Sequence, residues 1–221
     1  MTLRAALVLL LLAAGCMPDP APGTLRLLAL GDSYTIGEGV SEAERWPVRL
    51  AAALRAEAVD IRDLEIVAET GWTVAELDAG IDAAQPGGPF DLVTLLIGVN
   101  DQYRGGTTEA YRPEFRAMLA RAVAFAGGRA ARVVVLAIPD WGVTPFAAGR
   151  DRAAIAAEID AFNAAARQET ATAGARWVDV APVSRARGAA EVAPDGLHPS
   201  GALYAAWADL ALPDARAASG R

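Results

Sequence analysis

The chain has 221 residues and a formal net charge of −7, with 27 acidic residues against 20 basic ones. This length is enough for one domain with a sizeable core. The acidic balance leaves no basic patch for a phosphate backbone, which makes nucleic acid a poor candidate partner. Every basic residue is an arginine, which excludes the lysine of a phosphate-binding loop, Schiff-base lysines and the serine–lysine pair.

Residues 1–15 have the pattern of a secretory signal peptide, in which Arg4 precedes an apolar run at 5–14. The run is too short for a membrane-spanning helix, which needs about 20 residues to cross roughly 30 Å. The segment Ala13-Ala14-Gly15-Cys16 resembles a bacterial lipobox, in which the cysteine becomes the lipid-carrying first residue after cleavage. We therefore expect export and a membrane anchor at Cys16, in the periplasm or at the cell surface. The alternative is an ordinary signal peptide with an incidental cysteine.

Three segments follow the signal peptide. Residues 16–23 form a short proline-rich spacer. Residues 24–213 alternate apolar strands with helical patterns, which is typical of a parallel sheet covered on both faces. Residues 214–221 are rich in alanine and arginine, and we expect this tail to be frayed. The sequence thus predicts a single α/β domain between the spacer and the tail.

Five strands are predicted from short apolar runs, three of them nearly continuous, as expected when both faces of a strand are buried. The predicted strands are 25–30, 64–68, 92–97, 133–138 and 177–180.

Helices are predicted after these strands, because apolar residues recur there at helical spacing. Trp46-Pro47 begins the first helix, since proline fits a first helical turn. The apolar residues of the five helices are Leu50 and Leu54; Val74, Leu77 and Ile81; Phe115, Met118, Leu119 and Val123; Ile155, Ile159 and Phe162; and Leu203, Trp207 and Leu210.

Polar clusters follow the predicted strands, at the edge where chemistry collects in an open parallel sheet. In chain order they are Ser33, Gly71, Gly98-Val99-Asn100-Asp101, Pro139-Asp140-Trp141, and Asp195 with His198. Each cluster by itself also fits a turn or a helix cap. Their arrival at one edge, in this order, indicates a functional site.

Catalysis by a serine requires a base, because the hydroxyl is a poor nucleophile until its proton is removed. His198 is the only histidine, and Asp195 is the nearest carboxylate that could fix its tautomer. Acyl transfer also needs donors where negative charge develops on the carbonyl oxygen. The backbone N–H groups of Ser33 and Gly71 and the side-chain amide of Asn100 could supply them.

The chain has few nitrogen and sulfur side chains that could bind a metal ion. Cys16 is the only cysteine, so the folded part has neither an intrachain disulfide nor a cysteine metal site. With His198 as the single imidazole, a zinc site is not expected. Carboxylates for calcium or magnesium are plentiful, but they show no calcium-loop spacing. We expect no bound metal.

Four blocks between residues 24 and 212 resemble those of the SGNH (GDSL-type) hydrolases. The blocks are Gly31-Asp32-Ser33-Tyr34-Thr35-Ile36-Gly37-Glu38-Gly39, Glu69-Thr70-Gly71-Trp72-Thr73, Gly98-Val99-Asn100-Asp101 and Asp195-Gly196-Leu197-His198-Pro199. The first differs from the Gly-x-Ser-x-Gly elbow of α/β-hydrolases. The resemblance implies a flavodoxin-like, three-layer α/β/α domain that hydrolyses esters or thioesters without a cofactor. It implies Ser33 as nucleophile, His198 as base and Asp195 as the orienting acid, with Ser33, Gly71 and Asn100 as oxyanion-hole donors.

The predicted function is therefore a serine esterase acting on a small-molecule ester. Tyr103, Trp141 and Phe146 are candidate walls of the substrate pocket, although Trp141 and Phe146 could equally close the edge of the core. The connections are too short for a separate lid domain, which favours small or short-chain esters. A non-catalytic binding lipoprotein on the same fold is an alternative. Acyl transfer or thioester hydrolysis at the same site is another, because both pass through the same acyl-enzyme.

Overall fold

A computed structural model of the protein describes residues 24–220, so the predicted signal peptide, Cys16 and the proline-rich spacer lie outside the described residues. All five strands belong to one parallel sheet. They are β1 (Thr24–Gly31), β2 (Asp60–Ala68), β3 (Leu92–Leu96), β4 (Val133–Leu136) and β5 (Arg176–Val178). Their order in the sheet is β2–β1–β3–β4–β5, the doubly wound order of flavodoxin-like folds.

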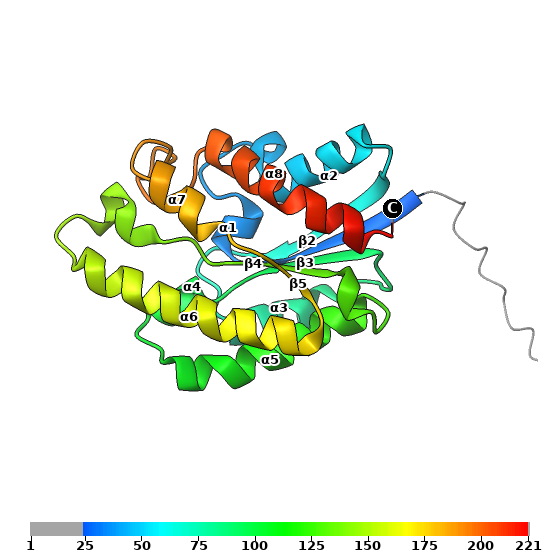
Figure 1. The fold of residues 1–221 in the computed structure, drawn as a ribbon, viewed down its shortest axis with the longest axis horizontal. Coiled ribbons are helices and arrows are strands. Elements are labelled where there is room, and N and C mark those ends of the chain that lie inside the picture. Colours follow the sequence, from blue (N-terminus) through cyan, green and yellow to red (C-terminus); the bar gives the residue numbers. More distant parts are fainter. Residues whose placement is uncertain (1–23, 221) are drawn as a thin grey trace, which may run out of the picture.

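Helices cover both faces of this sheet (Figure 1). One layer contains α2 (Trp46–Ala56), α7 (Ala181–Arg187) and α8 (Gly201–Ala218), and the other contains α3 (Val74–Ala84), α5 (Thr108–Phe125) and α6 (Arg152–Ala173). Two short helices, α1 (Ser33–Ile36) and α4 (Val99–Tyr103), follow β1 and β3 directly. Short 3-10 turns lie at Glu42–Glu44, Ala130–Arg132, Trp141–Val143 and Pro145–Ala147. The predicted three-layer α/β/α fold is confirmed.

The core forms where the apolar helix faces meet the sheet. In α2, Pro47 occupies the first turn, and Leu50 and Leu54 lie on one face and are fully buried. Trp46 of α2 and Trp207 of α8 are also fully buried. Leu210, by contrast, is 45% exposed, so it lies outside the buried face of α8.

Every strand differs from its predicted bounds by at least one residue, and β2 and β5 differ the most. β2 begins at Asp60 rather than at residue 64, because an edge strand can pair its backbone on one side while its polar side chains face solvent. Only Ile61 and Val67 of this strand are buried, so its first half shows no continuous apolar run. β5 ends at Val178, since the Asp179 carboxylate accepts a hydrogen bond from the Ala181 N–H (3.1 Å) and turns the chain into α7.

The prediction of a frayed tail at 214–221 is wrong for residues 214–218, which continue α8. Ala215 and Ala218 are buried, and Asp214 pairs with Arg176 of β5 (3.2 Å). Alanine has the highest helix propensity, and its small side chain allows close packing. The alanine-rich composition that suggested a frayed tail therefore suits the packed end of α8. Within residues 24–220, no helix combines the length and the apolar character needed to cross a membrane.

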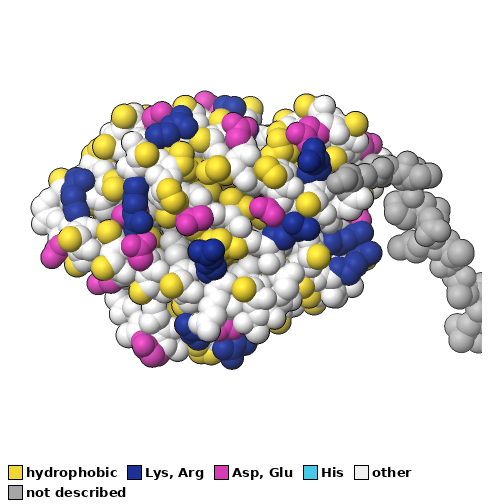
Figure 2. Space-filling model, viewed as in Figure 1, with side chains coloured by type: hydrophobic (Ala, Val, Ile, Leu, Met, Phe, Trp, Pro, Cys, Tyr) yellow, Lys and Arg dark blue, Asp and Glu magenta, His cyan; other side chains and the backbone are white. Residues whose placement is uncertain are grey.

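The surface carries charges of both signs. Figure 2 shows arginine and acidic side chains interspersed over the face seen in Figure 1, without a field of one sign.

Candidate active site

The strand order brings Ser33 and Asn100 to the same end of the sheet. β1 pairs with β2 on one side and with β3 on the other, and Gly31 is in register with Leu96. The chain therefore reverses its direction of winding between β1 and β3, where open α/β sheets bind their ligands. Ser33 begins α1 immediately after β1, and Asn100 lies in α4 immediately after β3. The loops that follow β1 and β3 diverge there, so side chains on both loops can contact one ligand.

One cavity of about 130 Å³ contains three of the predicted catalytic groups, Ser33, Asn100 and His198. The three predicted pocket aromatics, Tyr103, Trp141 and Phe146, also line it. Its remaining walls are Tyr34, Val99 and Leu197. Two further predicted residues, Asp195 and Gly71, are not among its lining residues, and their positions are described below.

Asp195 fixes the orientation of the His198 ring. The Nδ1 atom of His198 lies 2.7 Å from Asp195 Oδ2, and Asp195 Oδ1 accepts hydrogen bonds from the N–H groups of Leu197 (2.9 Å) and His198 (3.0 Å). Gly196 makes this tight turn possible, because its φ of +72° lies in the left-handed region that favours glycine. Partial burial raises the pKa of Asp195, but the hydrogen bonds from the His198 ring and from the two N–H groups lower it below its ordinary value. Asp195 is therefore a carboxylate at neutral pH, as an orienting acid must be.

The His198 side chain is fixed and nearly enclosed. Its residue is 7% exposed, and the edge of the ring contacts Tyr34 with the centroids 5.4 Å apart. Because Nδ1 faces Asp195, Nε2 is the nitrogen left for proton transfer. Within residues 24–220 no hydrogen bond joins Ser33 Oγ to this ring, and catalytic hydrogen bonds commonly tighten only when substrate binds.

The segment around Gly71 is tied to α4 by side chains that follow β3. The Asn100 amide donates one hydrogen bond to the Trp72 carbonyl (2.8 Å), which leaves its second N–H for another acceptor. Arg104 donates to the Gly71 carbonyl (2.6 Å). Gly71 has a φ of +88°, a conformation that side chains rarely adopt. Within the described range, the N–H groups of Ser33 and Gly71 donate to no other group. Two of these three unused donors, those of Gly71 and Asn100, thus lie on linked segments, and the third lies at the start of α1.

Two carboxyl groups near the site, one buried and one half-buried, were not singled out from the sequence. Asp32 is fully buried and caps α1 by accepting a hydrogen bond from the Tyr34 N–H (3.0 Å). Burial raises the pKa of Asp32 to about 8, although that hydrogen bond lowers it, and the nearby Asp101 charge adds to the increase. Burial likewise raises the pKa of Asp101 to about 6, against the lowering effect of the hydrogen bond from the Val74 N–H. The only sequence signal for Asp32 was an acid directly after a buried apolar strand.

Trp141 and Phe146 have different roles in the cavity wall. Trp141 is 4% exposed, and its indole N–H donates to Gln102 Oε1 (2.8 Å), so it closes the edge of the core and lines the cavity at the same time. Phe146 is 40% exposed and Tyr103 is 44% exposed. The ring of Tyr103 lies edge-on to Trp141, with centroids 5.4 Å apart. Tyr103 and Phe146 are therefore exposed side chains that pack against the fixed ring of Trp141.

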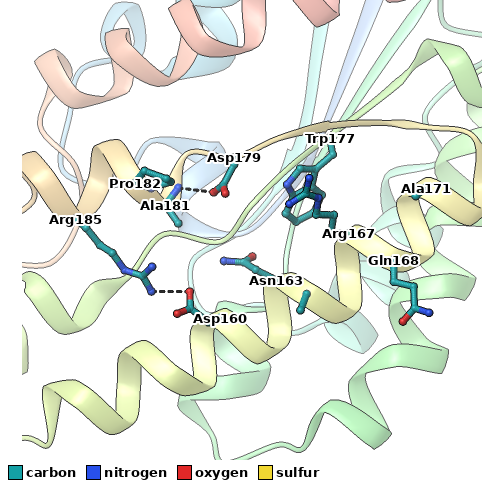
Figure 3. A pocket seen from close by; sticks show the side chains of 11 residues that line it. Asp160, Asn163, Arg167, Gln168, Ala171, Trp177, Asp179, Ala181, Pro182 and Arg185 are labelled. Atoms are coloured by element: carbon teal, nitrogen blue, oxygen red, sulfur yellow. Dashed lines mark hydrogen bonds and ion pairs between the residues drawn. The ribbon is translucent and has the colours of Figure 1, made fainter.

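A larger hollow of about 480 Å³ lies where α6, β5 and α7 meet (Figure 3). Its lining includes Trp177 and Arg167 but none of the predicted site residues. Its Arg185 pairs with Asp160 (2.8 Å). Its Asn163 accepts a hydrogen bond from the Ile138 N–H and donates one to the Ile138 carbonyl, two residues after β4. Much of its polar lining is thus already partnered within the fold. Within residues 24–220, no three His, Cys, Asp or Glu side chains are grouped to hold a metal ion.

Comparison with known protein families identifies the chain. The model of the GDSL-like lipase/acylhydrolase family matches residues 29–206, from the end of the first strand into the first turns of the last helix. The chain belongs to this family. Its fold and its family are thus those of a hydrolase, and the SGNH (GDSL-type) resemblance expected from the four sequence blocks is confirmed. No curated protein matches the sequence closely enough to count as a relative.

Several solved structures share the fold. TesA superposes with a TM-score of 0.68 at 22% identity, covering 87% of this chain and 99% of TesA. The acetylxylan esterase Axe2 from Geobacillus stearothermophilus has a TM-score of 0.67 at 18% identity, covering 86% and 94% of the two chains. The lipase/acylhydrolase from Enterococcus faecalis has a TM-score of 0.67 at 18% identity, covering 87% and 96%. The TM-scores establish a common fold, and the roles of individual residues stay predictions.

Proposed function

We propose that this GDSL-family hydrolase cleaves small or short-chain carboxylic esters through an acyl-enzyme on Ser33. One observation carries the proposal: His198, bound to Asp195 at 2.7 Å, shares a single cavity with Ser33 and Asn100 at the sheet's switch point. A serine, an imidazole whose second nitrogen is fixed by a carboxylate, and unused N–H donors are the components of acyl transfer.

The proposed reaction begins with proton transfer from Ser33 Oγ to His198 Nε2 as the oxygen attacks the ester carbonyl carbon. Asp195 stabilises the imidazolium that forms. Negative charge on the carbonyl oxygen is stabilised by the N–H groups of Ser33 and Gly71 and by the Asn100 amide. His198 then gives the proton to the departing alkoxide, and the same residues activate water to release the acid and regenerate Ser33.

The size of the cavity supports a small acyl group. Its volume of about 130 Å³ is below the roughly 300–1,000 Å³ of sites for drug-sized ligands. Val99, Leu197 and three aromatic residues form most of its wall, which suits an apolar acyl chain. An acetylxylan esterase among the similar folds gives further support for a short acyl group.

The test is hydrolysis of p-nitrophenyl esters with acyl chains of increasing length, comparing the wild type with Ser33→Ala and His198→Ala. Each variant should lose about 10⁴- to 10⁶-fold in kcat, as is typical when a triad member is removed. Circular dichroism checks that each variant is folded. A Ser33→Ala variant as active as the wild type contradicts the proposal. Absence of activity together with no fluorophosphonate labelling of Ser33 indicates a binding protein instead.

Export and lipid attachment at Cys16 are proposed on the sequence alone. Membrane fractionation of the full chain and of Cys16→Ala tests this, because loss of the lipid should release the variant from the membrane. Mass spectrometry of the mature N-terminus then distinguishes a lipidated cysteine from an ordinary cleavage site.

A further inference from the structure

Two aromatic side chains line both the active-site cavity and a second cavity beside it. The second cavity has a volume of about 420 Å³ and is lined in part by Arg150, Ala154 and Ile155. Tyr103 and Trp141 line both cavities, so these two side chains are the partition between them. A substrate group that outgrows the smaller cavity meets this partition first.

Of the two partition residues, only Trp141 is fixed by the core. Trp141 is buried and hydrogen-bonded to Gln102 (2.8 Å), and Gln102 in turn donates to Glu158 of α6 (2.6 Å). Tyr103 is the last residue of α4 and is 44% exposed. The position of its ring therefore depends on contacts made outside the core.

Arg150 supplies those contacts. Its guanidinium lies over the rings of Tyr103 (5.2 Å), Trp141 (5.3 Å) and Phe146 (5.7 Å), and Nη2 donates a hydrogen bond to Tyr103 Oη (3.2 Å). These distances fit cation–π stacking. Within residues 24–220, Arg150 forms no ion pair with a carboxylate. Its charged group is thus directed to the aromatic cluster and to the Tyr103 hydroxyl.

The orientation of the ester decides which of its groups meets these aromatic residues. The leaving-group oxygen must lie beside His198, because that ring returns the proton to it. The acyl chain leaves the carbonyl carbon on another side. Tyr103 follows Asn100, a proposed donor to the carbonyl oxygen, by three residues on α4, which places the two on the same face of the helix, so its ring is the wall assigned to the acyl chain.

We infer that Tyr103, held against Trp141 by Arg150, sets the upper limit of acyl-chain length in this enzyme. The inference rests on the proposed esterase function. Tyr103 acts by blocking the path into the second cavity, and Arg150 is a positioning residue that acts through Tyr103. Removing the ring joins the two cavities, whereas removing the guanidinium frees the ring to move aside.

The test compares kcat/KM for p-nitrophenyl octanoate with that for p-nitrophenyl acetate in the wild type and four variants. Tyr103→Ala should raise the octanoate-to-acetate ratio at least about tenfold, since a single methylene in a hydrophobic pocket changes kcat/KM by about 10- to 200-fold. Arg150→Ala should raise it about threefold, and Arg150→Lys should restore the wild-type ratio by keeping a cation over the ring. Arg167→Ala, an exposed arginine on α6 outside this cluster, should leave it unchanged.

Two further measurements separate this inference from the proposed function. Ester binding to Ser33→Ala and to Ser33→Ala/Tyr103→Ala, followed by tryptophan fluorescence, reports on the pocket without turnover. If the wild type hydrolyses no ester, the proposed function fails, whereas tighter octanoate binding in the double variant still supports the wall. An unchanged chain-length preference in folded Tyr103→Ala, by kinetics or by binding, overturns the inference. A shift seen only in a series of alkyl acetates overturns it as well, because the wall would then face the leaving group.

Discussion

The carboxyl group of Asp32 should make the protein less stable as the pH rises, and Asp32→Asn isolates this effect. Asp32 is fully buried, and within the described residues its Oδ2 atom has no hydrogen-bond partner. Its pKa of about 8 compares with about 3.9 for an aspartic acid in an unfolded chain. Between these two values the folded protein retains a proton that the unfolded chain releases. The free energy of unfolding therefore falls as the pH rises through this window and levels off above pH 8.

The size of the effect follows from the width of that window. Each pH unit within it corresponds to about 1.36 kcal/mol, so the wild type should lose about 3 kcal/mol between pH 5 and pH 7 through this group. Asparagine keeps the oxygen that caps the Tyr34 N–H, and it is as good a helix cap as aspartate. It also places an unpartnered N–H at the position of Oδ2, a cost that does not change with pH. The pH dependence of the difference between the two proteins is therefore the diagnostic quantity.

Urea unfolding of the wild type and Asp32→Asn, followed by tryptophan fluorescence from pH 5 to pH 8, measures this difference. Asp209→Asn, at an exposed position on α8, is the control for loss of one carboxylate. The stability of Asp32→Asn relative to the wild type should increase by about 3 kcal/mol from pH 5 to pH 7. Parallel stability curves for the two proteins would refute the reasoning, because they would show that Asp32 is ionised in the folded state.

Three other changes test the site and the fold. Asn100→Ala should lower kcat by about 10²- to 10³-fold in ester hydrolysis, the usual cost of one oxyanion donor, and a near-normal rate would withdraw that role. The wild-type kcat/KM should fall on acidification, because a base that already carries a proton cannot accept the one from Ser33, while Asp195, whose pKa is lowered, stays ionised; a rate that does not change with pH would contradict this. Glu169→Gln should lower the free energy of unfolding, measured in urea, by about 1–2 kcal/mol. The Glu169 carboxylate is 7% exposed, so losing its ion pair is costly, but its partner Arg116 (2.7 Å) is 62% exposed, so solvent weakens the pair. The Arg116 hydrogen bond lowers the pKa of Glu169, so this loss should disappear as the pH falls through the acidic range; a loss that persists there would point to packing.

Local patterns in the chain were sufficient for the central strands and for the choice of site residues. β1 and β3 are buried on both faces, so their apolar runs are visible without any knowledge of the fold. The single histidine left one candidate for the proposed base, and Asp195 lies three residues away, within the same turn. For these features, the residues that decide the structure are neighbours in the chain, or the chain contains only one residue of the required type.

Features at the edges of the fold were not predictable in this way. The first half of β2 is polar because it lies at a sheet edge, and the chain end is helical because Ala215 and Ala218 are buried. Neither an edge position nor a docking surface can be read from a local window, since both depend on residues distant in sequence.

By itself, the sequence determined the α/β alternation, the order of the four motif blocks and the chemistry available to them, because strand burial and motif spacing are local properties. Only the tertiary structure decided which residues share a cavity. Tyr103 and Arg150 are 47 positions apart in the sequence, yet their side chains are hydrogen-bonded (3.2 Å) beside that cavity. The protonation of Asp32 was decided in the same way, because the cost of burying a charge depends on everything packed around it.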